Sequence, residues 1–174
     1  MLDLIVKNGK CYIDGELKDV DVAIKDKKIQ QIGQISEEGK KIIDAKGHTV
    51  LPGCIDTQTH FREPGSTDTE DLHSGSRAAI AGGITSVFEM PNTNPPTSNK
   101  KEFQRKLDLA KNRMYCNYAF YFGATAENAD DLASLKDLEG CCGIKLFAGS
   151  STGNLLVAEE DDIDKVFQNS SKVV

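Results

Sequence analysis

The residues with the clearest capacity for chemistry lie at 53–65, in the segment GCIDTQTHFREPG. An acid, an amide, an imidazole and a guanidinium follow at every second position, as Asp56, Gln58, His60 and Arg62. Side chains two apart on a strand share a face, so the first three are predicted to converge. Imidazole binds zinc, a carboxylate orients a ligand or carries a proton, and guanidinium presents a planar fork to a carboxylate. The segment indicates a metal- and anion-binding strand end, and a strand with structural polar residues is the alternative.

Polar side chains also end three later strand patterns. Glu89 ends ITSVFEM and Asn92 follows it, Gly-Ala-Thr at 123–125 ends the third strand, and Lys145 lies in GIKLFAGSS. In α/β folds the functional residues gather at the carboxyl ends of the strands. Lysine is rarely buried without a partner, so Lys145 is a candidate functional residue. Extension of its side chain to the end of the sheet is the alternative.

The elements that would position these residues alternate between strand and helix. Strand patterns cover 50–56, 84–90, 115–124 and 142–149, and helical patterns cover 68–83, 100–112, 127–140 and 159–174. This order with short connections specifies a parallel sheet with right-handed crossovers. The first strand reads as nearly continuous apolar sequence, which predicts burial on both faces. A closed (β/α)8 barrel needs about 250 residues, so region 51–174 is predicted to be the first half of a barrel, with a small open sheet as the alternative.

Residues 1–50 have a different texture, in which short apolar and polar alternations are separated by turn signals. Asp14-Gly15 and the charged run at 25–28 predict hairpins, and 40–53 predicts a further strand pair with Lys46-Gly47 at its turn. This region is expected to be a segment of a small β-sandwich. The predicted fold class is therefore α/β, a partial barrel preceded by a β-sandwich segment.

Composition excludes several classes of function. A net charge of −6 and a pI near 5.1 argue against nucleic acid and anionic membranes as partners. No apolar run approaches a membrane span and the N-terminus lacks signal-peptide order, which favours a cytoplasmic protein. The five cysteines lack C-x-x-C spacing and are expected to be buried apolar residues. His48 and His73 are expected to be structural.

Three motifs together resemble the amidohydrolase superfamily and, within it, the dihydroorotases. They are DAKGHTVLPGCIDTQTHFREPG, EDLHSGSRAAIAGGITSVFEMPNTNPPT and GIKLFAGSSTGNLL, and the resemblance runs from Leu2 to Leu156. FREPG together with MPNTNP is similar to dihydroorotases rather than to the related hydantoinases and allantoinases. The resemblance implies zinc-dependent, reversible hydrolysis of dihydroorotate to N-carbamoyl-aspartate in pyrimidine biosynthesis.

The resemblance also implies which residues bind metal. The family pattern Asp-x-His-x-His-x-Arg reads here as residues 56–62, so His60 corresponds to the second zinc-binding histidine. Gln58 stands where the first would be, and its neutral amide is a weaker ligand. Lys145 corresponds to a lysine that reacts with CO2, giving a carbamate that bridges two metal ions. One or two zinc ions are therefore implied, with one site weakened.

Further implied roles concern substrate and catalysis. Arg62 and Asn92 correspond to the residues that bind the carboxylate of dihydroorotate. Bridged zinc would acidify the attacking water, with Lys145 and Asp56 as the catalytic residues of this chain. The family takes two more histidines and an aspartate from later strands, whereas this sequence has three histidines in all. We therefore expect an N-terminal portion of such an enzyme.

Two other functions remain open at this point. One is a different cyclic-amide hydrolase, a hydantoinase or allantoinase, which would not require Arg62. The other is an inactive dihydroorotase-like scaffold, as a homodimer or as a partner of aspartate transcarbamoylase, which Gln58 favours. Metal content would separate the scaffold from the enzymes.

Overall fold

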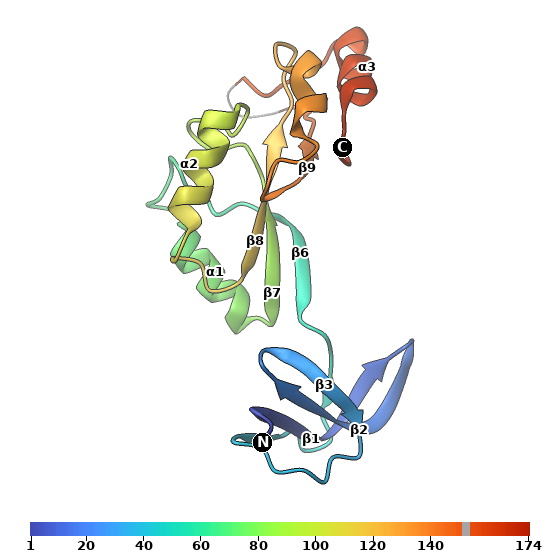
Figure 1. Ribbon diagram of the computed structural model, residues 1–174. Helices are drawn as coiled ribbons and strands as arrows, with labels where there is room; N and C mark the ends of the chain where they lie inside the picture. The colour runs from blue at the N-terminus through green and yellow to red at the C-terminus, as the bar shows by residue number, and fades with distance from the viewer. Residues whose placement is uncertain (151–153) are drawn as a thin grey trace. The chain divides into compact units, whose positions relative to one another are not determined.

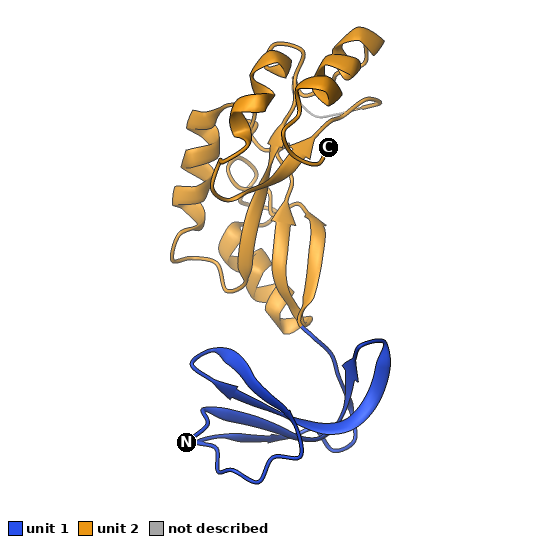
Figure 2. Ribbon diagram, turned by 45° about the vertical axis from the view of Figure 1, so that its right-hand side comes forward, with its two compact units in different colours: residues 1–52 blue, residues 53–174 orange. Residues whose placement is uncertain are grey.

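The computed structural model describes residues 1–150 and 154–174. The chain divides into two compact units, Met1–Pro52 and Gly53–Val174 (Figure 2). Residues 151–153 of the third motif lie outside the described residues. Each unit has its own sheet.

The first unit is a five-stranded sheet. Its strands are β1 (Leu4–Ile13), β2 (Glu16–Lys25), β3 (Lys28–Gly33), β4 (Ile42–Asp44) and β5 (Thr49–Val50). They follow the order β3-β2-β1-β4, with β5 also paired to β1. The predicted hairpins are present, since Asp14 and Gly15 have φ of 54° and 85°, and Asp26 and Lys27 have φ of 51° and 63°. Such positive values match the twist of two-residue hairpin turns.

The predicted pairing within 40–53 is wrong. Both β4 and β5 run parallel to β1, with Ile42 opposite Ile5 and Thr49 opposite Lys10. The turn at Lys46-Gly47 therefore interrupts one edge of the sheet and does not reverse the chain. Sequence alternation identifies strands but does not specify their partners, which explains the error.

The second unit alternates strands and helices around one parallel sheet (Figure 1). Its elements are β6 (Cys54–Thr59), α1 (Leu72–Ala81), β7 (Ile84–Glu89), α2 (Lys100–Ala110), β8 (Asn117–Gly123), a 3-10 helix η1 (Ala129–Leu135), β9 (Cys141–Lys145) and α3 (Glu160–Asn169). The sheet order β6-β7-β8-β9 follows the sequence, and every neighbouring pair is parallel. The predicted partial barrel is confirmed.

Two elements of this unit differ from their predictions. The helix predicted at 127–140 is the shorter η1, because over two turns an apolar pattern does not distinguish three from 3.6 residues per turn. The predicted burial of the first strand on both faces is also wrong. β6 begins only at Cys54, its sole strand neighbour in the described sheet is β7, and Ile55 is 59% exposed.

Helices α1 and α2 begin at side-chain caps, and α1 ends at a pair of glycines. The Asp71 side chain accepts a hydrogen bond from the Ser74 backbone N–H at 2.6 Å, and the Asn99 side chain accepts one from that of Glu102 at 2.9 Å. These caps satisfy backbone donors that the first turn leaves free. At its other end, α1 stops at Gly82, and Gly83 follows with a φ of 87°. The predicted Gly-Gly stop is confirmed.

The core of the second unit lies between the sheet and its helices. Phe103 of α2 packs on Phe120 and Phe122 of β8, with ring centroids 6.4 and 6.1 Å apart. Phe61, which follows β6, and Leu72 of α1 belong to the same buried cluster. This cluster fixes the first residue of the motif FREPG, Phe61, and the start of α1 that follows the motif.

Gly75 tests this packing, because α1 passes directly over the Phe61 ring. A Cβ at Gly75 would lie 2.4 Å from Cδ1 of Phe61, whereas a Cβ at Gly82 meets nothing nearer than 3.5 Å. Overpacking costs about 1–3 kcal/mol, which outweighs a gain of about 1 kcal/mol in helix propensity. We expect Gly75→Ala to lower the free energy of unfolding in chemical denaturation and Gly82→Ala to leave it nearly unchanged. Equal effects of the two variants would contradict the close packing.

Candidate active site

A pocket of about 430 Å³ opens beside the ends of β6 and β7. Its lining includes Arg62, Pro64, Ser66, Asn92, Asn94 and Pro96. The two side chains predicted to bind a carboxylate, Arg62 and Asn92, thus lie in one pocket although they come from different βα loops. A guanidinium and an amide offer several N–H donors to an anion at this position.

Arg62 has an unusual backbone conformation. Its φ of 61° lies in the left-handed region, which residues other than glycine adopt infrequently. The preceding Phe61 N–H donates to Oε1 of Glu89 at 3.2 Å, and Ser66 N–H donates to the Arg62 carbonyl at 3.0 Å. The chain is therefore held on both sides of a residue whose side chain is exposed to the pocket.

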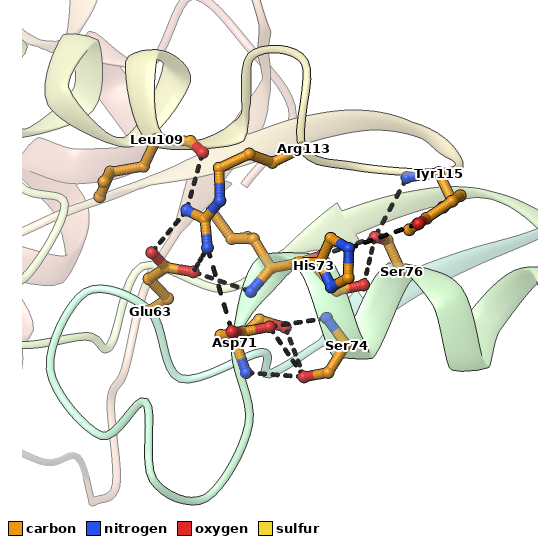
Figure 3. Close-up of polar contacts among 9 residues, drawn as sticks. Glu63, Asp71, His73, Ser74, Ser76, Leu109, Arg113 and Tyr115 are labelled. Carbon is orange, nitrogen blue, oxygen red and sulfur yellow. Dashed lines mark hydrogen bonds and ion pairs between the residues drawn. The ribbon is translucent and has the colours of Figure 1, made fainter.

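Glu63, the next residue, is buried and pairs with a distant arginine (Figure 3). Two nitrogens of Arg113 donate to its two oxygens, at 2.7 and 3.1 Å. Oε2 of Glu63 also accepts a hydrogen bond at 2.9 Å from the N–H of Leu72, which is the first residue of α1. The ion pair of Glu63 is therefore with Arg113, 50 residues away, although Arg62 is its neighbour in the sequence.

A second buried carboxylate, Glu89, ends β7. It is 1% exposed and pairs with Lys106 of α2, which is fully buried and also donates to the Met90 carbonyl at 2.9 Å. Burial raises the pKa of Glu89 to about 7, even though Lys106 acts to lower it. Burial also disfavours the charged form of Lys106 and so lowers its pKa, and the charge of Glu89 opposes that shift. Glu89 was a candidate functional residue from its position, and its carboxylate contacts Lys106 and the Phe61 N–H.

Sequence reasoning did not single out Lys106 or Arg113. A signal for Lys106 is present, since Phe103, Lys106 and Ala110 occur at the spacing of the buried face of α2. A lysine on such a face needs an acidic partner. Arg113 has no comparable signal, because it follows the helix in a short loop.

His60 is half-buried close to several of the predicted residues. Burial lowers its pKa most, the charge of Arg62 adds to this, and a hydrogen bond with the Asn92 side chain opposes it. The charges of Lys106 and Lys145 also lower this pKa. The structure thus brings His60, Arg62 and Asn92 together, with Lys145 near enough to affect the imidazole. A neutral imidazole has a nitrogen lone pair available for a metal ion.

Lys145 ends β9, opposite Gly123 of β8. Its side chain is half-buried, and Nζ lies 5.1 Å from the centroid of the Phe147 ring. The ammonium therefore rests against an aromatic face, a favourable cation–π arrangement. Its position at the carboxyl end of the sheet is where (β/α) folds place functional groups.

Asp56 and Gln58 make a local contact on β6. The Gln58 N–H donates to Oδ1 of Asp56 at 2.9 Å. The register between β6 and β7 shifts between Asp56 and Thr59, so simple alternation does not hold along this stretch. The only hydrogen bond that the described structure gives the Asp56 carboxylate is within its own strand, and the structure does not show the predicted convergence on His60.

The remaining histidines and the cysteines have contacts of their own. Nδ1 of His48 lies 2.8 Å from the Ala45 carbonyl, and the His73 ring packs edge-on against Tyr115 at 5.2 Å. These contacts agree with structural roles. All five cysteines are free, and Cys54 is exposed, contrary to the expectation of burial. None of the described helices has the length and apolar character to span a bilayer.

The fit to a metal ion is partial. Within residues 1–150 and 154–174, no three His, Cys, Asp or Glu side chains are arranged to hold one. His60 offers one nitrogen, and Lys145 would need to become a carbamate before it could serve as a ligand. The described residues therefore provide a fragment of a metal site. The pocket lined by Arg62 and Asn92, called the anion pocket from here on, is the more complete half of the candidate site.

A parallel half-barrel with polar groups at the ends of its strands is part of a (β/α)-barrel fold. Comparison with known proteins identifies the family. A sequence model of the amidohydrolase family matches residues 49–167. The chain belongs to the amidohydrolase family.

Curated relatives have different names. A dihydroorotase from Methanosarcina mazei is 38% identical over 163 residues, which cover 92% of this chain and 36% of that protein. An allantoinase from Escherichia coli O1:K1 is 40% identical over 149 residues, covering 85% of this chain and 33% of that protein. The chain therefore spans about a third of the length of these relatives. These two relatives, which match the chain almost equally well, carry the names of two different enzymes.

Solved structures give the same fold. L-hydantoinase (dihydropyrimidinase) from Arthrobacter aurescens superposes with a TM-score of 0.87 at 29% identity. The match covers 97% of this chain and 38% of that one. A D-hydantoinase structure gives a TM-score of 0.81 at 25% identity, covering 97% of this chain and 38% of that one.

The Glu89–Lys106 pair gives a pH-dependent prediction. In Lys106→Met the Glu89 carboxylate keeps its burial and loses its cation, which costs about 3–5 kcal/mol near neutral pH. The folded pKa of Glu89 then lies above about 7, while the ordinary value is 4.5, so the folded state binds more protons between these limits. The free energy of unfolding therefore falls as pH rises through this window. Urea denaturation at a series of pH values should show Lys106→Met losing stability steeply.

The matched control is Lys101→Met, which removes an exposed lysine from the same helix. Its free energy of unfolding should depend on pH as that of the unsubstituted chain does. A Lys106→Met profile parallel to that control would show that Glu89 is not held as an unpaired buried acid.

Proposed function

We propose that this chain is part of a dihydroorotase-like cyclic amide hydrolase, which interconverts dihydroorotate plus water and N-carbamoyl-aspartate in pyrimidine biosynthesis. The observation that carries the proposal is the shared pocket of Arg62 and Asn92. Because the chain spans about a third of its relatives, the complete reaction would also use residues outside it.

The chemistry of the pocket favours an anionic ring. Dihydroorotate carries a carboxylate, whereas allantoin and hydantoin rings carry none. A guanidinium binds a carboxylate through two parallel hydrogen bonds, which fix both the position and the orientation of the ring. A site built around such a charge also rejects neutral analogues, because its donors are then left unpaired. Arg62 would bind the carboxylate and Asn92 would donate a further hydrogen bond.

The metal-binding part of the proposal concerns His60, Gln58 and Lys145. Attack of the Lys145 amine on CO2, with loss of a proton, would form an N–C bond and give an anionic carbamate. That carbamate, the neutral His60 imidazole and, more weakly, Gln58 would hold one or two zinc ions with ligands from outside this chain. Zinc supplies a Lewis acid and an acidified water. Asp56 would carry a proton.

Two alternatives have support of their own. The 40% identity to an allantoinase favours a neutral-ring hydrolase. The partial metal site in the described residues favours an inactive scaffold, either as a homodimer or bound to aspartate transcarbamoylase. Ligand binding by Arg62→Ala separates the two substrate classes, and carbamate formation with zinc retention separates an enzyme from a scaffold.

Substrate class is tested by Arg62→Ala. The 174-residue chain should bind L-dihydroorotate in calorimetric titration, and bind allantoin more weakly. Loss of charged hydrogen bonds worth about 1.5–3 kcal/mol should weaken dihydroorotate binding by about 10- to 100-fold. Arg77→Ala, on the exposed side of α1, is the matched control and should bind as the unsubstituted chain does. Unchanged dihydroorotate binding by Arg62→Ala, or a preference for allantoin, would reject the proposed substrate.

The carbamate is tested with isotope-labelled bicarbonate and zinc. We expect a carbamate carbon signal in the NMR spectrum and zinc that remains with the protein after dialysis. Lys145→Arg keeps the charge and should lose the carbamate signal, while the exposed Lys100→Arg should keep it. Absence of both the carbamate and retained zinc would favour the scaffold.

A further inference from the structure

The left-handed conformation of Arg62 needs an explanation from its surroundings. A φ of 61° is unfavourable for arginine by about 1 kcal/mol or more. Such a conformation persists only where neighbouring contacts determine it. The Arg62 side chain is exposed and its carbonyl accepts one hydrogen bond, from Ser66 N–H at 3.0 Å. The remaining contacts that determine its φ come from the flanking residues, Phe61 and Glu63.

Phe61 is held on the amino-terminal side. Its ring is 6% exposed within the core, and its N–H donates to Glu89 at 3.2 Å. On the other side the carboxylate of Glu63 is 9% exposed and accepts three hydrogen bonds, two from Arg113 and one from Leu72 N–H. One peptide unit therefore separates Arg62 from each of two fixed neighbours.

Arg113 is anchored independently of the pocket (Figure 3). Its guanidinium donates to the Leu109 carbonyl in the last turn of α2 at 3.0 Å, and its backbone N–H donates to the Ala110 carbonyl at 3.0 Å. Asp71, at the N-terminus of α1, lies 4.0 Å from the same guanidinium. Arg113 thus joins the end of α2 to the start of α1 and to Glu63.

Loss of Arg113 would leave the Glu63 carboxylate without its paired cation. Without Arg113, Glu63 keeps one hydrogen-bond donor, the Leu72 N–H, for a nearly buried carboxylate. An unpaired buried charge is costly, so the carboxylate would move toward solvent. Because Glu63 is bonded covalently to Arg62, that movement rotates the Arg62 backbone and displaces its guanidinium from Asn92.

We propose that Arg113 is a positioning residue for Arg62: by clamping Glu63 against the start of α1, it holds Arg62 in its left-handed conformation and keeps the guanidinium in the anion pocket. The clamp itself concerns only this chain. Its effect on dihydroorotate binding rests on the proposed function.

The test compares Arg113→Met with Arg105→Met in the 174-residue chain. Arg105 lies in α2, the helix that precedes Arg113, and pairs with Glu102 at 3.3 Å in a salt bridge near the surface, so its loss matches the chemical change away from the clamp. A third variant, Arg113→Lys, keeps the charge and loses the two-pronged fork. Two readouts are used, the NMR backbone couplings and carbon shifts of Arg62, which report φ, and calorimetric binding of L-dihydroorotate.

We expect Arg113→Met to shift the Arg62 signals away from left-handed values and to weaken dihydroorotate binding on the order of tenfold or more. Arg113→Lys should restore both in part, and Arg105→Met should change neither. Signals from core residues such as Phe103 should remain dispersed in all three variants, which separates the local effect from unfolding. If Arg113→Met fails to fold, Arg113→Lys alone provides the comparison with Arg105→Met.

Unchanged Arg62 signals in a folded Arg113→Met or Arg113→Lys variant overturn the inference, whatever the ligand. Equal shifts in Arg105→Met overturn it as well. If the unsubstituted chain does not bind dihydroorotate, the proposed function fails, and the Arg62 signals still decide whether the clamp exists. The two failures are therefore distinguishable.

Discussion

Two carboxylates, Glu63 and Glu89, are buried where β6 and β7 end, and each requires a cation from a distant part of the chain. Lys106 of α2 meets Glu89, and Arg113, just beyond α2, meets Glu63. Removing one partner of such a pair leaves an uncompensated charge in the interior, which is far more costly than the pair itself is favourable. The packing of α2 therefore determines the conformation of both loops that form the pocket.

This arrangement explains why the two halves of the candidate site differ in completeness. The anion pocket depends on loops that follow β6 and β7, and both loops are fixed within the described residues. The metal-binding half depends on side chains at the ends of several barrel strands. Four parallel strands are present here, and they bring His60 and Lys145 to the same end of the sheet. The described residues thus complete the pocket of Arg62 and Asn92 more fully than they complete a metal site.

Membership of the amidohydrolase family and choice of substrate depend on different features. Relatives named dihydroorotase and allantoinase have nearly equal identity to this chain, 38% and 40%. Both identities reflect membership of one family, and membership of a family does not by itself specify the substrate. Discrimination between a ring with a carboxylate and one without it depends on a few charges in the pocket. Under the proposed function, Arg62 makes that distinction, since a guanidinium is always charged.

The sequence alone determined the order of strands and helices, the hairpin turns, the Gly-Gly end of α1 and the family, because these depend on local patterns and motif spacing. It also predicted that Arg62 and Asn92 act together, although only through resemblance. The exposure of β6 and the parallel pairing of β4 and β5 required the tertiary structure, since a strand pattern does not name its partners. The partners of Glu63 and Glu89 also became known only in three dimensions. Glu63 and Arg113 are 50 residues apart, and no local pattern connects them.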